Sequence, residues 1–281
     1  MFVFSVHGEL RSFLIKHAGT VGLVPTMGAL HKGHLSLVQK AAENNAWVLV
    51  SIFINPTQFD NSSDLATYPK NVAKDLESLS PFNKKLLVYT PDAADLYPEK
   101  IRAQKYAFGS LALHMEGAFR AGHFNGVATV VEALFRNLRP NRAYFGEKDF
   151  QQLQIIRALN GQLNLGVEII GCPIIREIDG VAMSSRNELL EKKERIAAPI
   201  IYQTLRKIKE NKEEWNVEYM THFFKKSIEE SPMLTLEYFC VAEETELIPL
   251  GALEKGSSYR IFVAVIAGKT RLIDNLELGR I

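Results

Sequence analysis

Cysteine, surplus charge of either sign and long hydrophobic runs are all scarce in this sequence of 281 residues. Its 33 basic side chains outnumber its 32 acidic ones by one, which gives a formal net charge of +1. A protein that binds nucleic acid depends on a surplus of Lys and Arg against phosphate, so this balance argues against a nucleic-acid partner. It argues equally against an acidic, unfolded chain, and an apolar content of 47% is ordinary for a folded protein.

Cysteine occurs only twice, at Cys172 and Cys240, in unrelated sequence contexts. A small secreted domain held by disulfides would need more cysteines, so we interpret both as buried apolar thiols in a reducing compartment. The segment at 1–16 lacks a basic stretch, and charged residues interrupt its apolar run. These features predict a cytoplasmic protein without a signal peptide.

Long apolar runs are missing as well. The longest stretches, at 46–54 and 261–268, are about half the length that a bilayer span requires. Their lack of alternation indicates strands that are buried on both faces. We therefore expect no membrane partner.

Strand-like and helix-like segments alternate through the first two thirds of the chain. Pro69 marks the start of one helix and Pro140 the end of another. Strands separated by helices of this length imply right-handed crossovers, so we expect an α/β fold with a doubly wound, Rossmann-like parallel sheet. The predicted strands lie at 20–26, 46–54, 85–90, 142–146 and 167–171, and the predicted helices at 33–45, 70–79, 126–138 and 149–163.

The pattern changes after about residue 178. Two long helices, at 188–211 and 216–230, are followed by two strands, at 234–244 and 259–268. This order is typical of a separate α+β domain. We therefore expect a Rossmann-like domain over residues 1–178 and a smaller C-terminal α+β domain over residues 179–281.

The sequence VPTMGALHKGH, residues 24–34, concentrates groups that suit phosphate. It lies between a predicted strand and a predicted helix, at the carboxyl edge of the sheet, where open α/β folds bind ligands. His31 and His34 are three residues apart and share one face of the first helical turn. The helix N-terminus offers backbone N–H groups, and Gly28 and Gly33 permit close approach. The alternative is a pair of histidines that only caps the helix.

A second candidate segment is AMSSRN, residues 182–187. The guanidinium of Arg186 would present a fork of donors to phosphate oxygens, and Ser184 and Ser185 would add hydroxyl donors. Taken alone, the segment fits a helix start with a serine cap equally well. Composition and spacing thus lead to an ATP-using α/β enzyme and no further.

The strand–turn–HxGH–helix arrangement resembles the signature of the nucleotidyltransferase superfamily, which includes class I aminoacyl-tRNA synthetases, and AMSSRN resembles its mobile phosphate loop. Four further segments are INPTQF (54–59), EGAFRAGHFNGVATVV (116–131), FGEKDFQQLQ (145–154) and GKTRLIDN (268–275). Together, the six segments resemble the pantoate–β-alanine ligase family from about residue 20 onward. The resemblance implies an AMP-forming ligase of class EC 6.3.2.1. In such an enzyme, pantoate and ATP form an acyl adenylate with release of pyrophosphate, and β-alanine then displaces AMP to give pantothenate.

The resemblance also implies an ATP site. His34 would be the main proton or hydrogen-bond donor, His31 its companion, and Lys148 and Arg186 the cations on the phosphates. A positive charge at a helix start is unfavourable, so Lys148 itself suggests an anionic ligand. The residues implied in ATP binding are Met27, Gly28, Ala29, Leu30, His31, Lys32, Gly33, His34, Gly146, Glu147, Lys148, Asp149, Ile175, Met183, Ser184, Ser185 and Arg186.

Pantoate carries two hydroxyls, a carboxylate and two methyl groups, so its pocket needs amide side chains and an apolar wall. Gln58 and Gln152 match the pantoate glutamines of the family, and Gln58 also lies toward the β-alanine position. Pro25, Met27 and Phe145 would supply the wall.

The glycine-rich loop 116–126 would be part of the pocket or its lid through Glu116, Arg120 and His123, although its glycines could merely shape a loop. Two positions depart from the family pattern. Ala121 stands where proline is common, and Glu188 stands where tyrosine is common.

The resemblance further implies Mg²⁺, which would neutralise the ATP phosphates. We assign it no protein ligand, because the sequence has no cysteine pair, no HExxH and no dense carboxylate loop. A homodimer, formed through a strand and a helix of the first domain, is implied as well.

Three other functions share some of these features. An adenylyltransferase has the HxGH motif but does not need the paired glutamines or the second domain. A tRNA-charging enzyme would need an anticodon module and a basic face. A nucleotide-binding module without activity would gain little from His34, Lys148 and Arg186 together.

Overall fold

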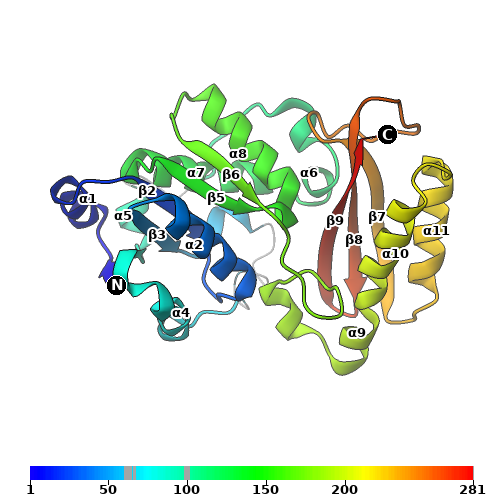
Figure 1. The fold of residues 1–281 in the computed structure, drawn as a ribbon, viewed down its shortest axis with the longest axis horizontal. Helices are drawn as coiled ribbons and strands as arrows, with labels where there is room; N and C mark the ends of the chain where they lie inside the picture. The colour runs from blue at the N-terminus through cyan, green and yellow to red at the C-terminus, as the bar shows by residue number, and fades with distance from the viewer. Residues whose placement is uncertain (60–64, 66–67, 98–101, 281) are drawn as a thin grey trace. The chain divides into compact units, whose positions relative to one another are not determined.

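The computed structural model describes residues 1–59, 65, 68–97 and 102–280 (Figure 1). Its contacts divide the chain into two compact units. The first unit comprises Met1–Phe108, Arg120–Glu147 and Gln152–Pro173, and the second comprises Gly109–Phe119, Lys148–Gln151 and Ile174–Ile281. Among the described residues, no helix is both long and apolar enough to cross a membrane.

The first unit is built on a six-stranded parallel sheet with the strand order β1-β4-β3-β2-β5-β6. This arrangement confirms the predicted α/β fold class. The strands are β1 (Phe2–Phe4), β2 (Val21–Thr26), β3 (Trp47–Ile52), β4 (Leu86–Tyr89), β5 (Arg142–Gly146) and β6 (Glu168–Cys172), and the helices are α1 (His7–Lys16), α2 (Lys32–Asn44), α4 (Val72–Leu79), α5 (Ala93–Leu96), α7 (His123–Leu138) and most of α8 (Phe150–Gln162). Short 3-10 turns lie at η1 (Pro56–Gln58), η2 (Ser80–Lys85) and η4 (Glu147–Asp149).

Burial on both faces explains why the central strands read as continuous apolar runs. Every residue of β4 is buried, as are five of the six residues of β3. Helix α2 packs against β2, β3 and β5 through Leu37, Val38 and Ala41, which share one face of the helix. Burial of each leucine or valine here contributes about 1.5–3 kcal/mol, so this packing rather than local propensity holds the layers together.

Parallel pairing brings three loops to one edge of this sheet. Strand β2 lies between β3 and β5, and all three run in the same direction. The chain passes from β2 to β3 and β4 on one side and places β5 on the other, so the direction of strand order reverses at β2. The carboxyl edge at such a reversal is where open α/β sheets bind their ligands.

The second unit contains a three-stranded antiparallel sheet, β7-β8-β9, with β7 at Leu234–Glu243, β8 at Ser258–Ala267 and β9 at Thr270–Arg280. Helices α10 (Pro199–Glu210) and α11 (Val217–Glu229) lie side by side against it (Figure 1). Their apolar faces meet the buried face of β8 in one core that includes Leu205, Met220 and Phe224. The unit also contains η3 (Gly109–Ala112), α6 (Glu116–Phe119), η5 (Ser185–Leu189) and α9 (Lys192–Ala197).

The predicted helix at 188–211 is wrong as a single helix. The structure has η5, then α9, then α10, and Pro199 occupies the first turn of α10. Proline lacks the N–H that would continue a helix, and its ring would collide with the preceding turn, so α9 ends before it.

Other boundaries differ by a few residues, and several elements were not predicted. Helix α4 begins at Val72 behind an Asn71 cap, and α7 begins at His123, three residues earlier than predicted. Strand β1, helix α1, the short helices α5 and α6, and strand β9 are among the missed elements. In β9, buried Asp274 and Asn275 replace apolar residues and obscure the strand pattern.

Candidate functional site

Residues 27–34, called here the histidine loop, connect β2 to α2 at the carboxyl edge of the first unit. Gly28 and Ala29 both have left-handed backbone conformations, with φ of 86° and 51°. The N–H of Gly28 donates to Oγ1 of Thr26 over 3.2 Å, and Oγ1 of Thr26 itself donates to the carbonyl of Ser51 on β3. The turn is therefore fixed to β2 directly and to β3 through Thr26.

His31 and His34 cap α2 reciprocally. Nδ1 of His31 accepts from the N–H of Gly33 at 3.1 Å, and Nδ1 of His34 accepts from the N–H of His31 at 3.3 Å. The two ring centroids are 4.0 Å apart. The capping role that the sequence left open as an alternative is thus present, and it takes one backbone N–H that we had expected to face phosphate.

This capping also fixes the chemistry of the two rings. Because each Nδ1 accepts a hydrogen bond, the proton of each neutral imidazole lies on Nε2. Both rings therefore carry an N–H donor on the side opposite to the cap. A pair of such donors at a helix N-terminus suits an anionic ligand.

Gln58, at the end of η1, contacts the histidine loop directly. Its Nε2 donates to the sulfur of Met27 at 3.0 Å, and its Oε1 accepts from Nδ2 of Asn55 at 3.1 Å. Asn55 is 1% exposed, and its Oδ1 accepts from the hydroxyl of Tyr97 at 2.9 Å. Burial raises the pKa of Tyr97 to about 12, so its hydroxyl remains protonated and able to donate at neutral pH.

Helix α7 packs against η1 and holds Asn55 and Gln58 in place. The carbonyl of Gly126 accepts from Asn55 at 3.1 Å. A Cβ at Gly126 would lie 2.1 Å from the carbonyl oxygen of Thr57, so only glycine permits this approach. Nδ1 of His123 donates to the carbonyl of Gln58 at 2.9 Å, since a carbonyl can only accept. Nε2 of His123 then accepts from Arg120 at 3.1 Å.

The remaining predicted residues of the first unit lie near the ends of β2 and β5. Pro25 is partly buried in β2, Phe145 is buried in β5, and Gly146 ends β5. Gln152 is partly buried in the first turn of α8, whereas Lys32 is exposed. Glu147 follows β5, and its charge adds to the burial that raises the pKa of the nearby Cys172 thiol to about 11.

In the second unit, a hairpin brings Ile175 beside the 183–186 segment. The N–H of Met183 donates to the carbonyl of Ile175 at 2.9 Å, and Arg176 pairs with Ala182 in an antiparallel bridge. Ser184 caps η5 through an oxygen that accepts from the N–H of Arg186 at 3.3 Å. The serine cap that the sequence allowed is therefore present within the predicted phosphate segment.

The base of this hairpin is anchored by a buried ion pair. The guanidinium of Arg176 donates to both carboxylate oxygens of Asp274 on β9 at 2.7 and 3.0 Å, and it lies 3.7 Å from the ring centre of Tyr202. Asn187 donates to Glu177 at 2.7 Å and to the carbonyl of Ala182 at 3.0 Å. These contacts tie the predicted phosphate segment to the sheet of its own unit.

Lys148 and Asp149 belong to the second unit as well. Nζ of Lys148 lies 3.5 Å from Oδ1 of Asp149, and the carbonyl of Lys148 accepts from Asn275 at 2.9 Å. The segment 268–275, which the sequence singled out without a role, thus supplies backbone support to Lys148 and a partner to Arg176.

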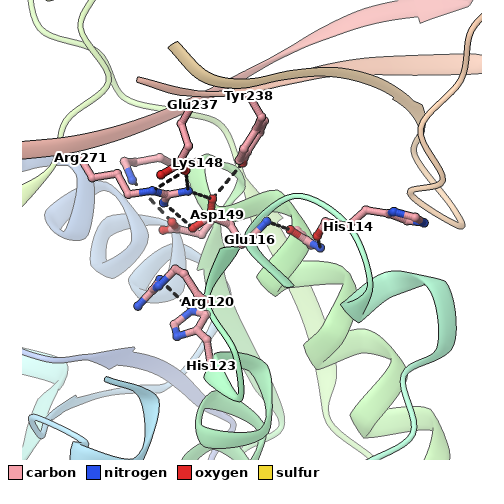
Figure 2. A network of polar contacts seen from close by, with 10 residues as sticks. His114, Glu116, Arg120, His123, Lys148, Asp149, Glu237, Tyr238 and Arg271 are labelled. Atoms are coloured by element: carbon pink, nitrogen blue, oxygen red, sulfur yellow. Dashed lines mark hydrogen bonds and ion pairs between the residues drawn. The ribbon is translucent and has the colours of Figure 1, made fainter. Parts of the chain in front are cut away.

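Glu116 lies in a buried charge network of the second unit (Figure 2). Both of its carboxylate oxygens accept from the guanidinium of Arg271 at 2.7 Å, and Oε1 also accepts from Tyr238 at 2.9 Å. Arg271 contacts Glu237 too. Burial by itself lowers the pKa of Arg271, but Glu116 and Glu237 raise it overall, so the guanidinium stays charged. The network fastens α6 to β7 and β9.

Sequence reasoning missed several of these residues. Arg176 is 98 residues from Asp274 and Arg271 is 155 residues from Glu116, so no spacing signal relates the members of either pair. Asn55 lies in the INPTQF segment, of which only Gln58 was given a role from the sequence. The carboxylate of Asp75 accepts from two N–H groups of the histidine loop, yet in the sequence it is one of many acidic helix residues.

Comparison with known proteins agrees with this geometry. The profile of the family described as Pantoate-beta-alanine ligase matches residues 3–277. A pantothenate synthetase of Christiangramia forsetii is 49% identical over 260 residues, covering 92% of each chain. A crystal structure of pantothenate synthetase from Thermus thermophilus superposes with a TM-score of 0.91 at 38% identity, covering 99% of this chain and 100% of that chain.

A third relative was crystallised with ligands. The structure of a Francisella tularensis pantoate-beta-alanine ligase, described as complexed with beta-gamma ATP and beta-alanine, superposes with a TM-score of 0.81. Identity is 35%, and the match covers 99% of this chain and 98% of that chain. Matched along nearly its whole length in sequence and in fold, the chain belongs to the pantoate–β-alanine ligase family.

Proposed function

We propose that the protein joins pantoate to β-alanine at the expense of ATP, forming pantothenate, AMP and pyrophosphate. The observation that carries this proposal is the contact between Gln58 and the histidine loop, beside two imidazoles whose protons lie on Nε2. An amide that can orient a hydroxy acid thus adjoins donors that suit a phosphate. Membership of the ligase family indicates which substrates these groups would bind.

In the first step, a carboxylate oxygen of pantoate attacks the α-phosphorus of ATP, and the bond to the bridging oxygen of pyrophosphate breaks. Negative charge grows on the phosphate oxygens, where the Nε2–H groups of His34 and His31 would donate hydrogen bonds. Lys148 and Arg186 would add cationic donors. One such donor is worth about 3–4 kcal/mol, so several must act together.

In the second step, the neutral amine of β-alanine attacks the carbonyl carbon of the pantoyl adenylate. The amide bond forms, the bond from carbon to the AMP oxygen breaks, and the amine releases a proton. Gln58 and Gln152 would hold the hydroxyl and carboxylate oxygens of pantoate, while Pro25, Met27 and Phe145 would face its methyl groups. Glu116, Arg120 and His123 would shape the surroundings of this pocket.

The residues proposed for ATP recognition come from both units. In the first unit they are the histidine loop together with Gly146 and Glu147, and in the second unit Lys148, Asp149, Ile175 and residues 183–186. Residues 1–178 would bind ATP and pantoate, and residues 179–281 would act as a lid. The chain from Ile174 onward falls in one contact unit, which supports a boundary near residue 178, although Gly109–Phe119 and Lys148–Gln151 also belong to that unit.

Mg²⁺ is part of the proposal as the counter-ion of the ATP phosphates. Within the described ranges, no three His, Cys, Asp or Glu side chains gather into a metal site. The proposal gives the ion phosphate and water ligands and assigns it no protein ligand. When bound, it would supply charge neutralisation on the nucleotide.

A homodimer in the cytoplasm completes the proposal. Strand β1 is an edge strand, and Phe2, Val3 and Ile15 of β1 and α1 are exposed, which supports an interface through a strand and a helix. Cys172 and Cys240 are free thiols, as a reducing compartment favours. Sedimentation equilibrium should give twice the chain mass of 31.6 kDa, and a single-chain mass would contradict the dimer.

A coupled assay tests the reaction. Purified protein with ATP, Mg²⁺ and pantoate should turn over, releasing AMP and pyrophosphate continuously, only when β-alanine is also present. Omission of pantoate is the matched control and should abolish both products. Retention of AMP on an acceptor product would show an adenylyltransferase instead.

A further inference from the structure

We propose that Asp75 is a positioning residue for the histidine loop, and that through it α4 determines where His34 acts. The proposal relies on the proposed function for the identity of the reaction, and on the contacts of the loop for its geometry. Asp75 lies in the first turn of α4 and is 2% exposed. It touches the loop rather than any reacting group.

The carboxylate of Asp75 binds two successive backbone groups of the loop. Oδ1 accepts from the N–H of Leu30 at 2.8 Å, and Oδ2 accepts from the N–H of Ala29 at 3.2 Å. Hydrogen bonds to a charged acceptor are roughly twice as strong as bonds between neutral groups. A buried carboxylate whose two oxygens both accept hydrogen bonds from one turn therefore fixes that turn strongly.

The turn needs such support because of its backbone conformation. Ala29 has a φ of 51°, a left-handed conformation that is strained for a residue with a Cβ. The carboxylate offsets this strain by pairing the N–H groups that the left-handed turn directs toward α4. A Cβ at Gly28 would lie 3.0 Å from Oδ2 of Asp75 and 3.3 Å from Ile52, so the loop packs closely onto the carboxylate.

Asp75 differs from the other described side chains that accept from backbone N–H groups of the loop. Thr26, His31 and His34 lie in the loop or directly before it, and they accept from the N–H groups of Gly28, Gly33 and His31. They shape the loop internally. Asp75 comes from α4 and fixes the loop relative to the body of the first unit, just before the histidine pair.

The expected consequence is catalytic, since small displacements of reacting groups are costly. A misplacement of about 1 Å can lower a rate by about 10²-fold. Without the carboxylate, Ala29 and Leu30 would lose both anchors, and the Nε2 donors of His31 and His34 would no longer be held in one place. A lower stability of the fold alone would not account for such a loss of turnover.

The test compares Asp75→Asn with Asp95→Asn. Asp95 is a matched control, because its carboxylate also accepts from a backbone N–H, that of His7 at 2.8 Å, and from Tyr89 at 2.6 Å, away from the histidine loop. The two readouts are amide hydrogen exchange of peptides within 27–34, followed by mass spectrometry, and steady-state kinetics. If Asp75→Asn does not fold, Asp75→Ser replaces it, since its hydroxyl is too short to bridge both N–H groups.

In Asp75→Asn, peptides within 27–34 should exchange at least tenfold faster, while peptides of β3 and β4 stay within twofold of wild type. Turnover should fall ten- to hundredfold, and the KM for β-alanine should stay within twofold. Asp95→Asn should lower the melting temperature but keep turnover and loop exchange within twofold.

Unchanged loop exchange or turnover in Asp75→Asn would overturn the proposal, and so would an equal loss in Asp95→Asn. If the wild-type protein formed no pantothenate, the proposed function would fail instead. The exchange comparison would still decide whether Asp75 positions the loop.

Discussion

At the scale of single residues, each of the two histidines caps α2 with one ring nitrogen and carries a proton on the other. The Nδ1 atoms of His31 and His34 accept from backbone N–H groups, and this bonding places the remaining proton on Nε2 of each ring. The spacing in HKGH predicted that the rings share a face, and the structure confirms it with a centroid distance of 4.0 Å. Capping and donation are therefore compatible, because they use opposite sides of the imidazole.

These two uses can be separated by substitution of His34. His34→Ala should lose both the cap and the donor, whereas His34→Asn keeps an acceptor for the N–H of His31. We expect both variants to lose about 10²- to 10³-fold in turnover, as on removal of a preorganised donor. Only His34→Ala should also lose about 0.5–2 kcal/mol of unfolding free energy. Urea unfolding and turnover measure the two effects, and near wild-type turnover in either variant would remove Nε2 of His34 from the chemistry.

Gly126 provides a second test at this scale. A Cβ there would lie 2.1 Å from the carbonyl oxygen of Thr57 and 2.6 Å from Cα of Gln58, so Gly126→Ala must push η1 away from α7. We expect a loss of about 1–3 kcal/mol in unfolding free energy and a raised KM for pantoate.

The matched control for Gly126 is Gly161→Ala in α8, where a Cβ would meet nothing within 4 Å. Alanine should stabilise that helix by about 0.5–1 kcal/mol without a kinetic effect. Equal behaviour of the two variants in urea unfolding and pantoate kinetics would contradict the packing argument.

At the scale of elements, charged side chains join segments that hydrophobic patterning leaves apart. Arg271 of β9 links α6 to β7 through Glu116 and Glu237 (Figure 2), and Arg176 links the 175–183 hairpin to Asp274. Apolar cores hold the longer helices on the sheets, and Val181 of the hairpin and the ring contact of Phe119 with Tyr238 give the short segments apolar contacts as well. Partly buried ion pairs add to their attachment, and such pairs are costly to break because one charge is left unpaired.

Arg271→Met tests the network. It keeps apolar volume but leaves Glu116 and Glu237 without their cation, so we expect a loss of about 3–5 kcal/mol in the free energy of unfolding by urea. Arg271→Lys retains the charge but not the planar fork, and its loss should be smaller. A ranking in which the lysine variant is as unstable as the methionine variant would show that geometry, not charge, dominates at this site.

The elements also show how far sequence patterning reaches. Apolar periodicity located the strands and helices around β2, β3 and β5, because burial on both faces leaves a strong signal. It failed at α9 and α10, where Pro199 divides a continuous amphipathic pattern, and at β9, where polar residues are buried against partners distant in sequence. Motifs revealed the histidine loop, since its residues are contiguous. Asp75 gave no signal, and Arg271 lay in the segment 268–275 without an assigned role, because both roles arise only when the chain is folded.

At the scale of the whole molecule, a net charge of +1 means that an anionic substrate must be met by local donors rather than by a general positive field. The carboxyl edge of the parallel sheet supplies such a place through the histidine loop, with Gln58 beside it. In the proposed site, the second unit would contribute residues 148–149 and 183–186, which are stabilised by its own sheet and hairpin. Each unit therefore builds its share of the proposed site from its own contacts.

If the pantoate carboxylate attacks the α-phosphorus of ATP, one of its oxygen atoms must leave with AMP, and oxygen labelling follows that atom. Pantoate labelled with ¹⁸O in its carboxylate is turned over with ATP, Mg²⁺ and β-alanine, and the products are examined by mass spectrometry. One ¹⁸O atom should appear in AMP and one should remain in the amide carbonyl of pantothenate, because the oxygen that attacked phosphorus leaves with AMP. Label found in pyrophosphate or phosphate, with AMP unlabelled, would contradict the account.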